Sequence, residues 1–154
     1  MKHLTFEWHG SGSLKEALNW PFSYFSFVGN SNGIYLIRFW SDALKCLTIT
    51  VSMRYVGFRD EVGILIFNDG NEQYPGEERY DLPALFLEKR TVRKLVINDN
   101  DTLVESGIEF EFDGCLVTIV SGLFPETISI SGLSFLERKS VPEMPMEQYS
   151  RVTM

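Results

Sequence analysis

Residues 107–130, GIEFEFDGCLVTIVSGLFPETISI, constrain the fold most strongly because they have the pattern of a β-hairpin followed by a third strand. Asp113-Gly114 is a dipeptide favoured in a two-residue type I′ turn, whose central residues both need positive φ. The pairs predicted across this turn are Phe112 with Cys115, Phe110 with Val117, and Ile108 with Ile119. Glu109 and Glu111 would then point to the other side. The tract therefore predicts an antiparallel sheet with one apolar and one acid-bearing face.

Further strands are predicted on both sides of this tract. They cover residues 3–8, 22–28, 34–40, 45–56, 62–67 and 91–97. Residues 45–56 alternate most clearly: Leu47, Ile49 and Val51 share a face with Met53 and Tyr55, and hydroxyl groups occupy the other face. Polar or glycine-containing turns separate these segments, including residues 29–33 and 98–101.

Helices are predicted to be few and short. Ser13 followed by Glu16 has the spacing of a capping box, so residues 14–19 should form a short helix that Pro21 ends. Residues 82–90 could form one helical turn or stay extended, and we favour the turn. The many short strands predict a mainly β fold, either an antiparallel sandwich or a half-open barrel, with one or two short helices.

Length and proline placement predict one domain over residues 1–154, with 140–154 as an extended C-terminal tail. A chain of 154 residues can bury a core of its own. Pro142 and Pro145 favour an extended course on the body over a helix.

Charge and hydropathy restrict the classes of partner. Twenty-one acidic against 14 basic residues give a net charge of −7. A positive surface would be needed for nucleic acid or an anionic membrane, so we expect neither as a partner. Apolar runs fall short of the roughly 20 residues that span a bilayer, and the start of the chain lacks a signal-peptide pattern. The expected location is the cytoplasm.

Motifs for catalysis are weak. Residues 29–33 satisfy G-x-S-x-G, but strands are predicted on both sides of them, whereas that motif works as a strand-to-helix turn. His3 and His9 precede the serine, and we interpret both as surface histidines. Glu109 and Glu111 have the spacing of a carboxylate pair, yet a small sheet lacks the cleft of a glycosidase. We therefore predict no catalytic residues and no enzyme.

Metal and cofactor chemistry is also not predicted. Cys46 and Cys115 lie in apolar strand patterns without CxxC spacing, and we interpret both as buried free thiols. They and the two histidines lack the usual spacing of zinc ligands. Residues 98–101 begin like a calcium loop, but the pattern fails at Leu103 and Val104.

The basic run at residues 89–94, KRTVRK, allows two interpretations. Four cations in six residues could grip a phosphate. Lysine and arginine also protect an edge strand against pairing with other chains, and we favour this interpretation.

The 107–130 tract and the PEMPMEQY tail resemble bacterial immunity proteins of polymorphic-toxin and contact-dependent growth-inhibition systems. The residues that carry the resemblance are Gly107, Asp113, Gly114, Gly122, Pro125, Ile130 and the tail at 142–149. The resemblance implies a stoichiometric inhibitor that binds one cognate toxin, usually a nuclease with a basic active-site cleft. An acidic surface would suit such a partner by speeding association and setting specificity.

Candidate partner-binding residues are acidic side chains and the tyrosines among them. They are Glu72, Tyr74, Glu77, Glu78, Tyr80, Asp81, Asp99, Asp101, Glu105, Glu109 and Glu111. Two alternatives stay open. One is a ligand-carrying β-barrel with an enclosed apolar pocket, and the other is a small enzyme in which His3 or His9 meets a carboxylate.

Overall fold

The computed structural model describes residues 2–41, 45–57, 60–70, 78–82, 90–112, 114–133 and 141–154. Its elements are β1 (Lys2–Leu4), β2 (Glu7–His9), α1 (Leu14–Ala17), β3 (Phe22–Asn30), β4 (Gly33–Ser41), β5 (Cys46–Tyr55), β6 (Glu61–Gly70), β7 (Tyr80–Asp81), β8 (Thr91–Asp99), β9 (Thr102–Phe112), β10 (Cys115–Ser121), β11 (Ile128–Ser131), η2 (Met146–Gln148) and β12 (Ser150–Thr153). The predicted mainly β class is confirmed. The structure is a strongly curled half-barrel.

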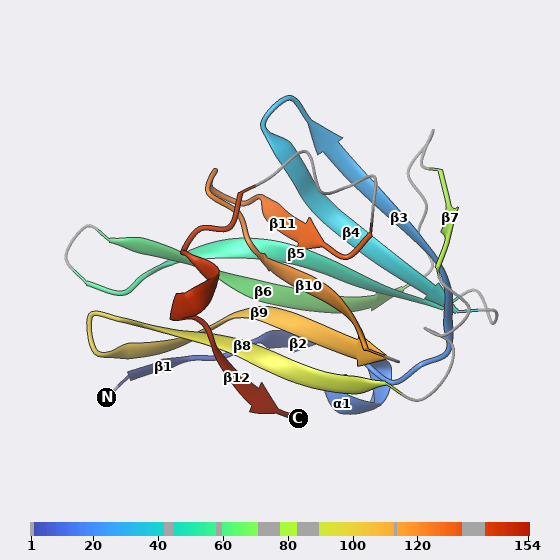
Figure 1. Ribbon diagram of the computed structural model, residues 1–154, viewed down its shortest axis with the longest axis horizontal. Helices are drawn as coiled ribbons and strands as arrows, with labels where there is room; N and C mark the ends of the chain where they lie inside the picture. The colour runs from blue at the N-terminus through green and yellow to red at the C-terminus, as the bar shows by residue number, and fades with distance from the viewer. Residues whose placement is uncertain are drawn as a thin grey trace.

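The described strands form one sheet that curls upon itself (Figure 1). Its main path runs β12-β8-β9-β10-β11-β4-β5-β6-β2. β3 pairs antiparallel with β4 on the edge opposite β5, and β7 pairs antiparallel with β3. No helix in the described ranges is long and apolar enough to cross a membrane.

The N-terminal segment bridges two distant strands, where the sequence predicted a single strand at residues 3–8. β1 runs parallel to β9, and β2 runs parallel to β6. Between them, the backbone N–H of Phe6 donates to Glu105 Oε1 at 2.8 Å. The segment thus connects the two sides of the curl. Both of its pairings join residues more than 50 positions apart, so local alternation carries no signal for them.

The hairpin of β9 and β10 has the predicted register. Phe112 pairs with Cys115, Phe110 with Val117, and Ile108 with Ile119. Gly114 has a φ of 76°, as one central position of a type I′ turn requires. Asp113 itself lies outside the described residues. The dipeptide therefore identified the position and length of this turn correctly.

A bulge in β9 exchanges the two faces of the strand. Leu95 pairs with Gly107 and Val96 pairs with Glu105, so Ser106 is an extra residue in β9. An extra residue shifts the side-chain alternation by one. Residues 105 and 109 consequently face opposite sides of the sheet although they share parity.

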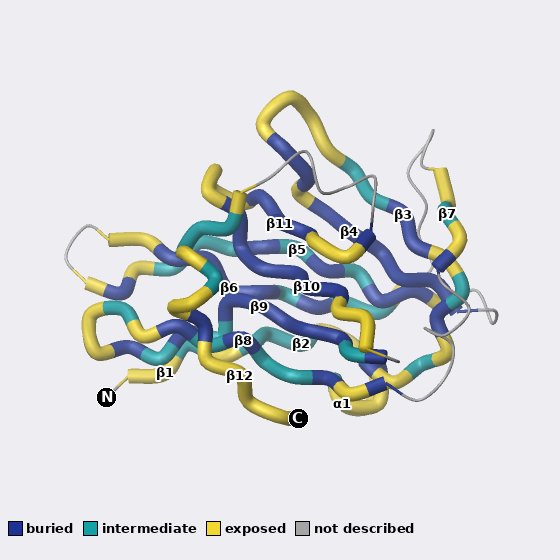
Figure 2. The backbone as a smooth tube through the Cα atoms, viewed as in Figure 1, coloured by how far each residue is buried: buried dark blue, intermediate teal, exposed yellow. Residues whose placement is uncertain are grey.

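Buried side chains form two clusters. The larger cluster lies within the curl and contains Phe22, Phe25, Phe39, Phe67 and Phe110. The smaller contains Ile64, Leu95, Ile97, Val104, Val120 and Tyr149. The buried backbone of the central strands is shown in dark blue in Figure 2. β8 and β9 carry apolar side chains on both faces. One face packs in the larger cluster, and the other packs in the smaller cluster, to which the C-terminal tail contributes.

The tail lies along the body, and residues 146–148 within it form the 3-10 turn η2. Gly122 bridges to Pro142, the backbone N–H of Glu143 donates to the Ser121 carbonyl at 2.8 Å, and Tyr149 is buried. β12 then pairs antiparallel with β8. β8 is therefore not an edge strand, and the edge interpretation of the basic run is wrong for its described residues 90–94, because β12 occupies the position that would have needed protection.

Of the predictions for single residues and short segments, some are confirmed and others are wrong. Ser13 caps α1 by accepting the Glu16 N–H at 3.1 Å, as predicted, although the helix ends at Ala17. Both cysteines are free, but only Cys46 is buried. Cys115 is exposed because it directly follows the turn, so its predicted burial is wrong. Residues 83–89, where a helical turn was favoured, lie outside the described residues.

Candidate functional site

Two turns meet at one end of the sheet and bring acidic side chains together. In the turn from β8 to β9, Asp99 pairs with Thr102, which leaves Asn100 and Asp101 as the two central residues. Their φ angles are 51° and 58°. Positive φ at both positions is typical of a type I′ turn, and Asn and Asp tolerate this conformation. The turn predicted at 98–101 is thus confirmed.

The side chain of Asn100 ties this turn to the connection between β5 and β6. Its amide nitrogen donates to Asp60 Oδ2 at 3.0 Å and to Asp99 Oδ1 at 3.1 Å. A Cβ on Gly57 would come within 3.3 Å of that same amide, so the two turns approach closely. The amide therefore holds two carboxylates near each other on a fixed backbone.

An exposed tyrosine accompanies these carboxylates. Tyr55, at the end of β5, is 71% exposed, although sequence alternation placed it on a buried face. It pairs with Glu61, and the hydrogen bond to that carboxylate raises the pKa of the Tyr55 hydroxyl. We call Tyr55, Asp60, Glu61, Asp99 and Asp101 the acidic end; both of its turns lie at the left of Figure 1.

The carboxylates of the acidic end have no cationic partner in the described part of the chain. The ion pairs there involve other acids. Arg59 is adjacent in sequence and lies outside the described residues. Clustered like charges produce a negative potential that attracts cations and speeds their association. The acidic end can therefore receive Lys or Arg side chains from a partner.

The loop predicted as the first partner-binding patch is only partly described. Three of its candidates, Glu72, Tyr74 and Glu77, lie outside the described residues. Glu78 and Asp81 are exposed. Tyr80 packs inward, 5.5 Å from the Phe25 ring and 5.7 Å from the Phe27 ring, and burial raises its pKa. Its hydroxyl donates to Glu78 at 3.1 Å. The Tyr80 ring thus serves packing within the protein.

The strand carboxylates are engaged with cations of the same chain. Arg151 Nε contacts both carboxylate oxygens of Glu109 at 3.1 Å, and Arg93 contacts Glu109 at 3.3 Å and Glu111 at 2.5 Å. Glu109 is only 1% exposed. The predicted exposure of Glu109 is therefore wrong, because β12 brings Arg151 over it. These contacts also leave the paired carboxylates poorly suited to glycosidase chemistry.

Glu105 lies apart from the acidic end, although the sequence grouped it with Asp99 and Asp101. It receives Lys94 at 2.6 Å and the Phe6 N–H at 2.8 Å. The bulge at Ser106 turns Glu105 toward the N-terminal segment. Its function in the fold is to hold that segment against β9.

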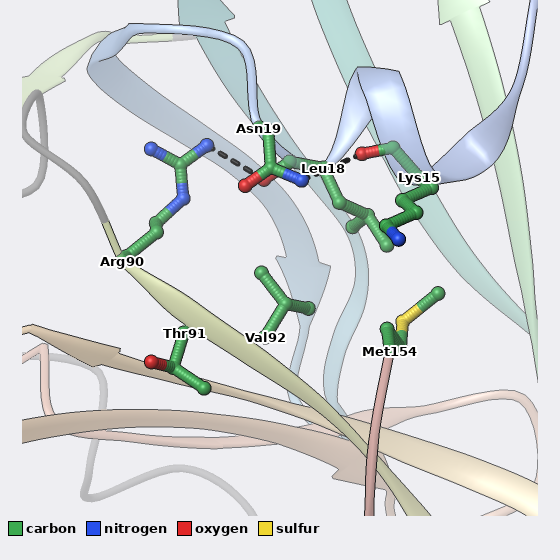
Figure 3. Close-up of a pocket in the computed structure, with 7 residues that line it drawn as sticks. All are labelled: Lys15, Leu18, Asn19, Arg90, Thr91, Val92 and Met154. Atoms are coloured by element: carbon green, nitrogen blue, oxygen red, sulfur yellow. Dashed lines mark hydrogen bonds between the residues drawn. The ribbon is translucent and has the colours of Figure 1, made fainter.

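Arg90 is a buried cation that lines a pocket of about 240 Å³ (Figure 3). Arg90 is 7% exposed, and its guanidinium donates to the Leu18 and Trp20 carbonyls at 2.7 and 2.6 Å. The group lies 4.8 Å from the Phe22 ring, and burial lowers the pKa of Arg90 to about 10. These carbonyls follow α1, so Arg90 satisfies acceptors at the helix end. Two backbone carbonyls and the Phe22 ring thus contact its guanidinium, and these contacts serve the fold.

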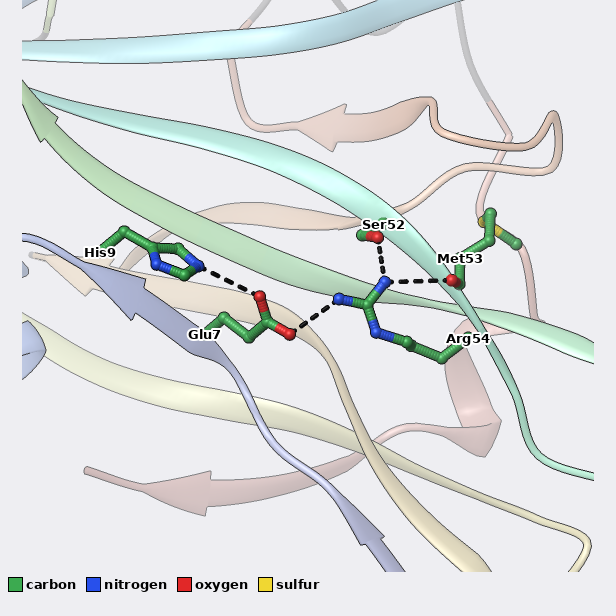
Figure 4. Close-up of polar contacts among 5 residues, drawn as sticks. All are labelled: Glu7, His9, Ser52, Met53 and Arg54. Atoms are coloured by element: carbon green, nitrogen blue, oxygen red, sulfur yellow. Dashed lines mark hydrogen bonds and ion pairs between the residues drawn. The ribbon is translucent and has the colours of Figure 1, made fainter.

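A histidine does meet a carboxylate near the N-terminus (Figure 4). His9 Nε2 lies 3.1 Å from Glu7 Oε2, while Glu7 Oε1 receives Arg54 at 2.7 Å. Arg54 also contacts Ser52 and the Met53 carbonyl. The hydrogen bond from Arg54, followed by that with His9, lowers the pKa of Glu7. More than half of the His9 side chain is exposed, so this contact has the character of a surface ion pair.

A carrier would need space inside the curl. Aromatic side chains occupy it instead: Phe39 and Phe110 lie 5.8 Å apart, edge to face, and Phe22 lies 5.5 Å from Phe39. A second hollow of about 410 Å³ lies on the outside, between β10, β11 and the tail. Both hollows are partly open to solvent. Neither has the enclosed apolar form expected of a carrier.

Neither the arrangement of possible metal ligands nor comparison with known proteins assigns a function to the site. Among the residues described, no group of three His, Cys, Asp or Glu side chains is arranged to hold a metal ion. Comparison with known proteins found no matching family model, no matching curated protein and no matching solved structure. The site must therefore be interpreted from its own geometry.

Sequence reasoning found two of the five residues of the acidic end. Asp99 and Asp101 were predicted from their turn, whereas Tyr55, Asp60 and Glu61 were missed. The signal was a pair of acids between two predicted strands, the alternating segment 45–56 and the apolar segment 62–67. What could not be inferred is that the two turns lie beside each other, because Asp60 and Asn100, which join them, are 40 residues apart in sequence.

Proposed function

We propose that this protein is an immunity protein that binds a cognate toxin and neutralises it by covering a basic active site, as expected for a nuclease. The acidic end carries this proposal. It combines carboxylates that have no counter-charge among the described residues, a fixed backbone at the turn and a protruding tyrosine. Aromatic residues beside charged groups are typical anchors of protein interfaces.

Charge and rigidity both favour such a role. The excess of seven negative charges would draw a basic partner from a distance, and contacts at the acidic end would orient it. The Asn100 amide limits the motion of Asp60 and Asp99, so less conformational entropy is lost on binding. The location in the cytoplasm stays part of the same proposal.

The test uses the product of the neighbouring gene as the candidate toxin. Co-expression should protect cells from it, and the purified proteins should form a one-to-one complex. The double variant Asp60→Lys, Glu61→Lys should weaken binding at least about 100-fold, since close interfacial charge pairs contribute several kcal/mol. Glu16→Lys with Glu147→Lys is the matched control, because both acids are exposed elsewhere and the net charge changes equally.

Equal weakening by the two double variants would show that only overall charge matters and would refute the acidic end as the binding site. Full binding by both would refute the electrostatic mechanism. Raising the salt concentration should reduce the association rate of the unaltered protein more than that of Asp60→Lys, Glu61→Lys.

A further inference from the structure

A rigid turn between β10 and β11 exposes large apolar side chains. Leu123 is 59% exposed and Phe124 is 54% exposed. Val141 is 61% exposed and accepts the Leu123 N–H through its carbonyl at 2.8 Å. We call these three residues the apolar turn; the connection that carries Leu123 and Phe124 is exposed in Figure 2.

The turn is fixed by hydrogen bonds and by a close approach. Thr127 donates to the Phe124 carbonyl through its backbone N–H at 3.1 Å and through its hydroxyl at 2.6 Å. The Gly122 N–H donates to the Thr127 carbonyl at 2.7 Å, and any Cβ on Gly122 would collide with Thr127. Phe124 is therefore presented outward on a preorganised backbone, and ordering it costs little on binding.

A groove of about 410 Å³ adjoins the apolar turn. Its lining residues are Thr118, Val120, Ser129, Ile130, Ser131, Pro142 and Met146. We call this the outer groove. Pro142 is next to Val141 and bridges to Gly122, so the groove and the protruding turn are parts of one continuous surface. Residues 134–140 lie outside the described residues and belong to neither the apolar turn nor the outer groove.

We propose that this surface binds a second copy of the chain, with Phe124 of each copy seated in the outer groove of the other. A two-fold interface needs a surface that complements itself, and a protrusion beside a hollow provides this. The charge distribution favours the same partner. Two copies with a net charge of −7 repel each other overall, so they can associate best through a surface without charge. All ten residues of the apolar turn and the outer groove are uncharged. Glu126, in the same turn, is exposed and belongs to neither set.

The oligomeric state tests the proposal directly. Sedimentation or light scattering of the purified full chain should give a dimer, and Phe124→Ser should give a monomer whose far-UV circular dichroism spectrum matches that of the unaltered protein. Val152→Ser is the matched control: Val152 is 48% exposed on β12, and its loss should leave the dimer intact. A monomer at all concentrations of the unaltered protein, or a dimer of Phe124→Ser, would overturn the proposal.

Complementation gives the sharper test. Ser131→Arg places a charged, bulky side chain in the outer groove and should also give a monomer. In a mixture of Phe124→Ser and Ser131→Arg, one pair of intact surfaces is restored, so a mixed dimer should form. Two monomers that stay separate when mixed would contradict the two-fold arrangement.

If Phe124→Ser weakens binding of the toxin and the unaltered protein is monomeric, the apolar turn belongs to the toxin interface and the dimer is refuted. The acidic-end variants test the toxin proposal independently.

Discussion

The acidic end and the ion-paired carboxylates Glu105, Glu109 and Glu111 both consist of acids on or between strands, but the environments of their carboxylates are opposite. Within the described residues, the acids at the end have no cationic partner, whereas each paired carboxylate contacts Arg or Lys of the same chain. The difference lies in register. Arg93 is directly opposite Glu109, and β12 adds Arg151 to the same carboxylate. An acid within a strand is thus committed to the fold when a neighbouring strand supplies a cation, while an acid in a turn or at the end of a strand stays available to a partner.

Removing Glu109 should produce the largest effect on stability. Glu109→Leu leaves Arg93 and Arg151 without their shared carboxylate at a site that is 1% exposed. The arginines are partly exposed and can be hydrated, so the expected loss is about 2 kcal/mol of unfolding free energy, below the cost of breaking a fully buried pair. Urea unfolding measures it.

Glu111→Leu is the matched control for that change. Glu111 contacts Arg93 at 2.5 Å but is 39% exposed, and Arg93 keeps Glu109 as a partner. Its loss should cost about 0.5 kcal/mol, as for a surface ion pair. Equal losses in the two variants would show that the burial of Glu109 adds nothing to the contribution of its ion pairs.

How far the sequence predicts this comparison depends on the range of each contact. The β9–β10 hairpin, the Ser13 cap and the turn at Asn100 were predictable, because each is specified by neighbouring residues. The burial of Glu109 was not, since β12 reaches β8 from the far end of the chain. The position of Glu105 depends on the extra residue Ser106, whose bulge has no clear sequence signal.

Neutralising the acidic end should leave stability almost unchanged. In the triple variant Asp60→Asn, Asp99→Asn, Asp101→Asn, each side chain keeps an acceptor oxygen, so the Asn100 contacts can persist. Surface substitutions of this kind have small effects. The melting temperature should stay within about 2 °C of the unaltered protein, or rise slightly as like-charge repulsion is relieved. A fall of several times that size would show that these acids serve the fold.

Glu143 belongs to neither group and should respond to pH in the direction opposite to a salt-bridged acid. It is a half-buried residue of the tail, accepts the Gly63 N–H of β6 at 3.0 Å and has no cationic partner in the described part of the chain. The Ser121 hydroxyl lies beside it. Burial is the main reason that the pKa of Glu143 is raised, and the hydrogen bonds oppose the shift. The same burial, with the nearby Glu143 charge, raises the pKa of Tyr149 to about 12.

A raised carboxyl pKa means that the folded protein binds the proton more tightly than the unfolded chain, so ionisation of Glu143 costs stability at pH values above its folded pKa. This cost disappears as the pH falls through the raised pKa toward the ordinary value of 4.5. Glu143→Gln keeps an acceptor for Gly63 and removes the charge. The variant should therefore melt above the unaltered protein at pH 7, and the difference should shrink toward pH 4. Thermal melts across that range measure it. A variant that is less stable at pH 7 would show that the charged carboxylate anchors the tail and that its hydrogen bonds outweigh the cost of its burial.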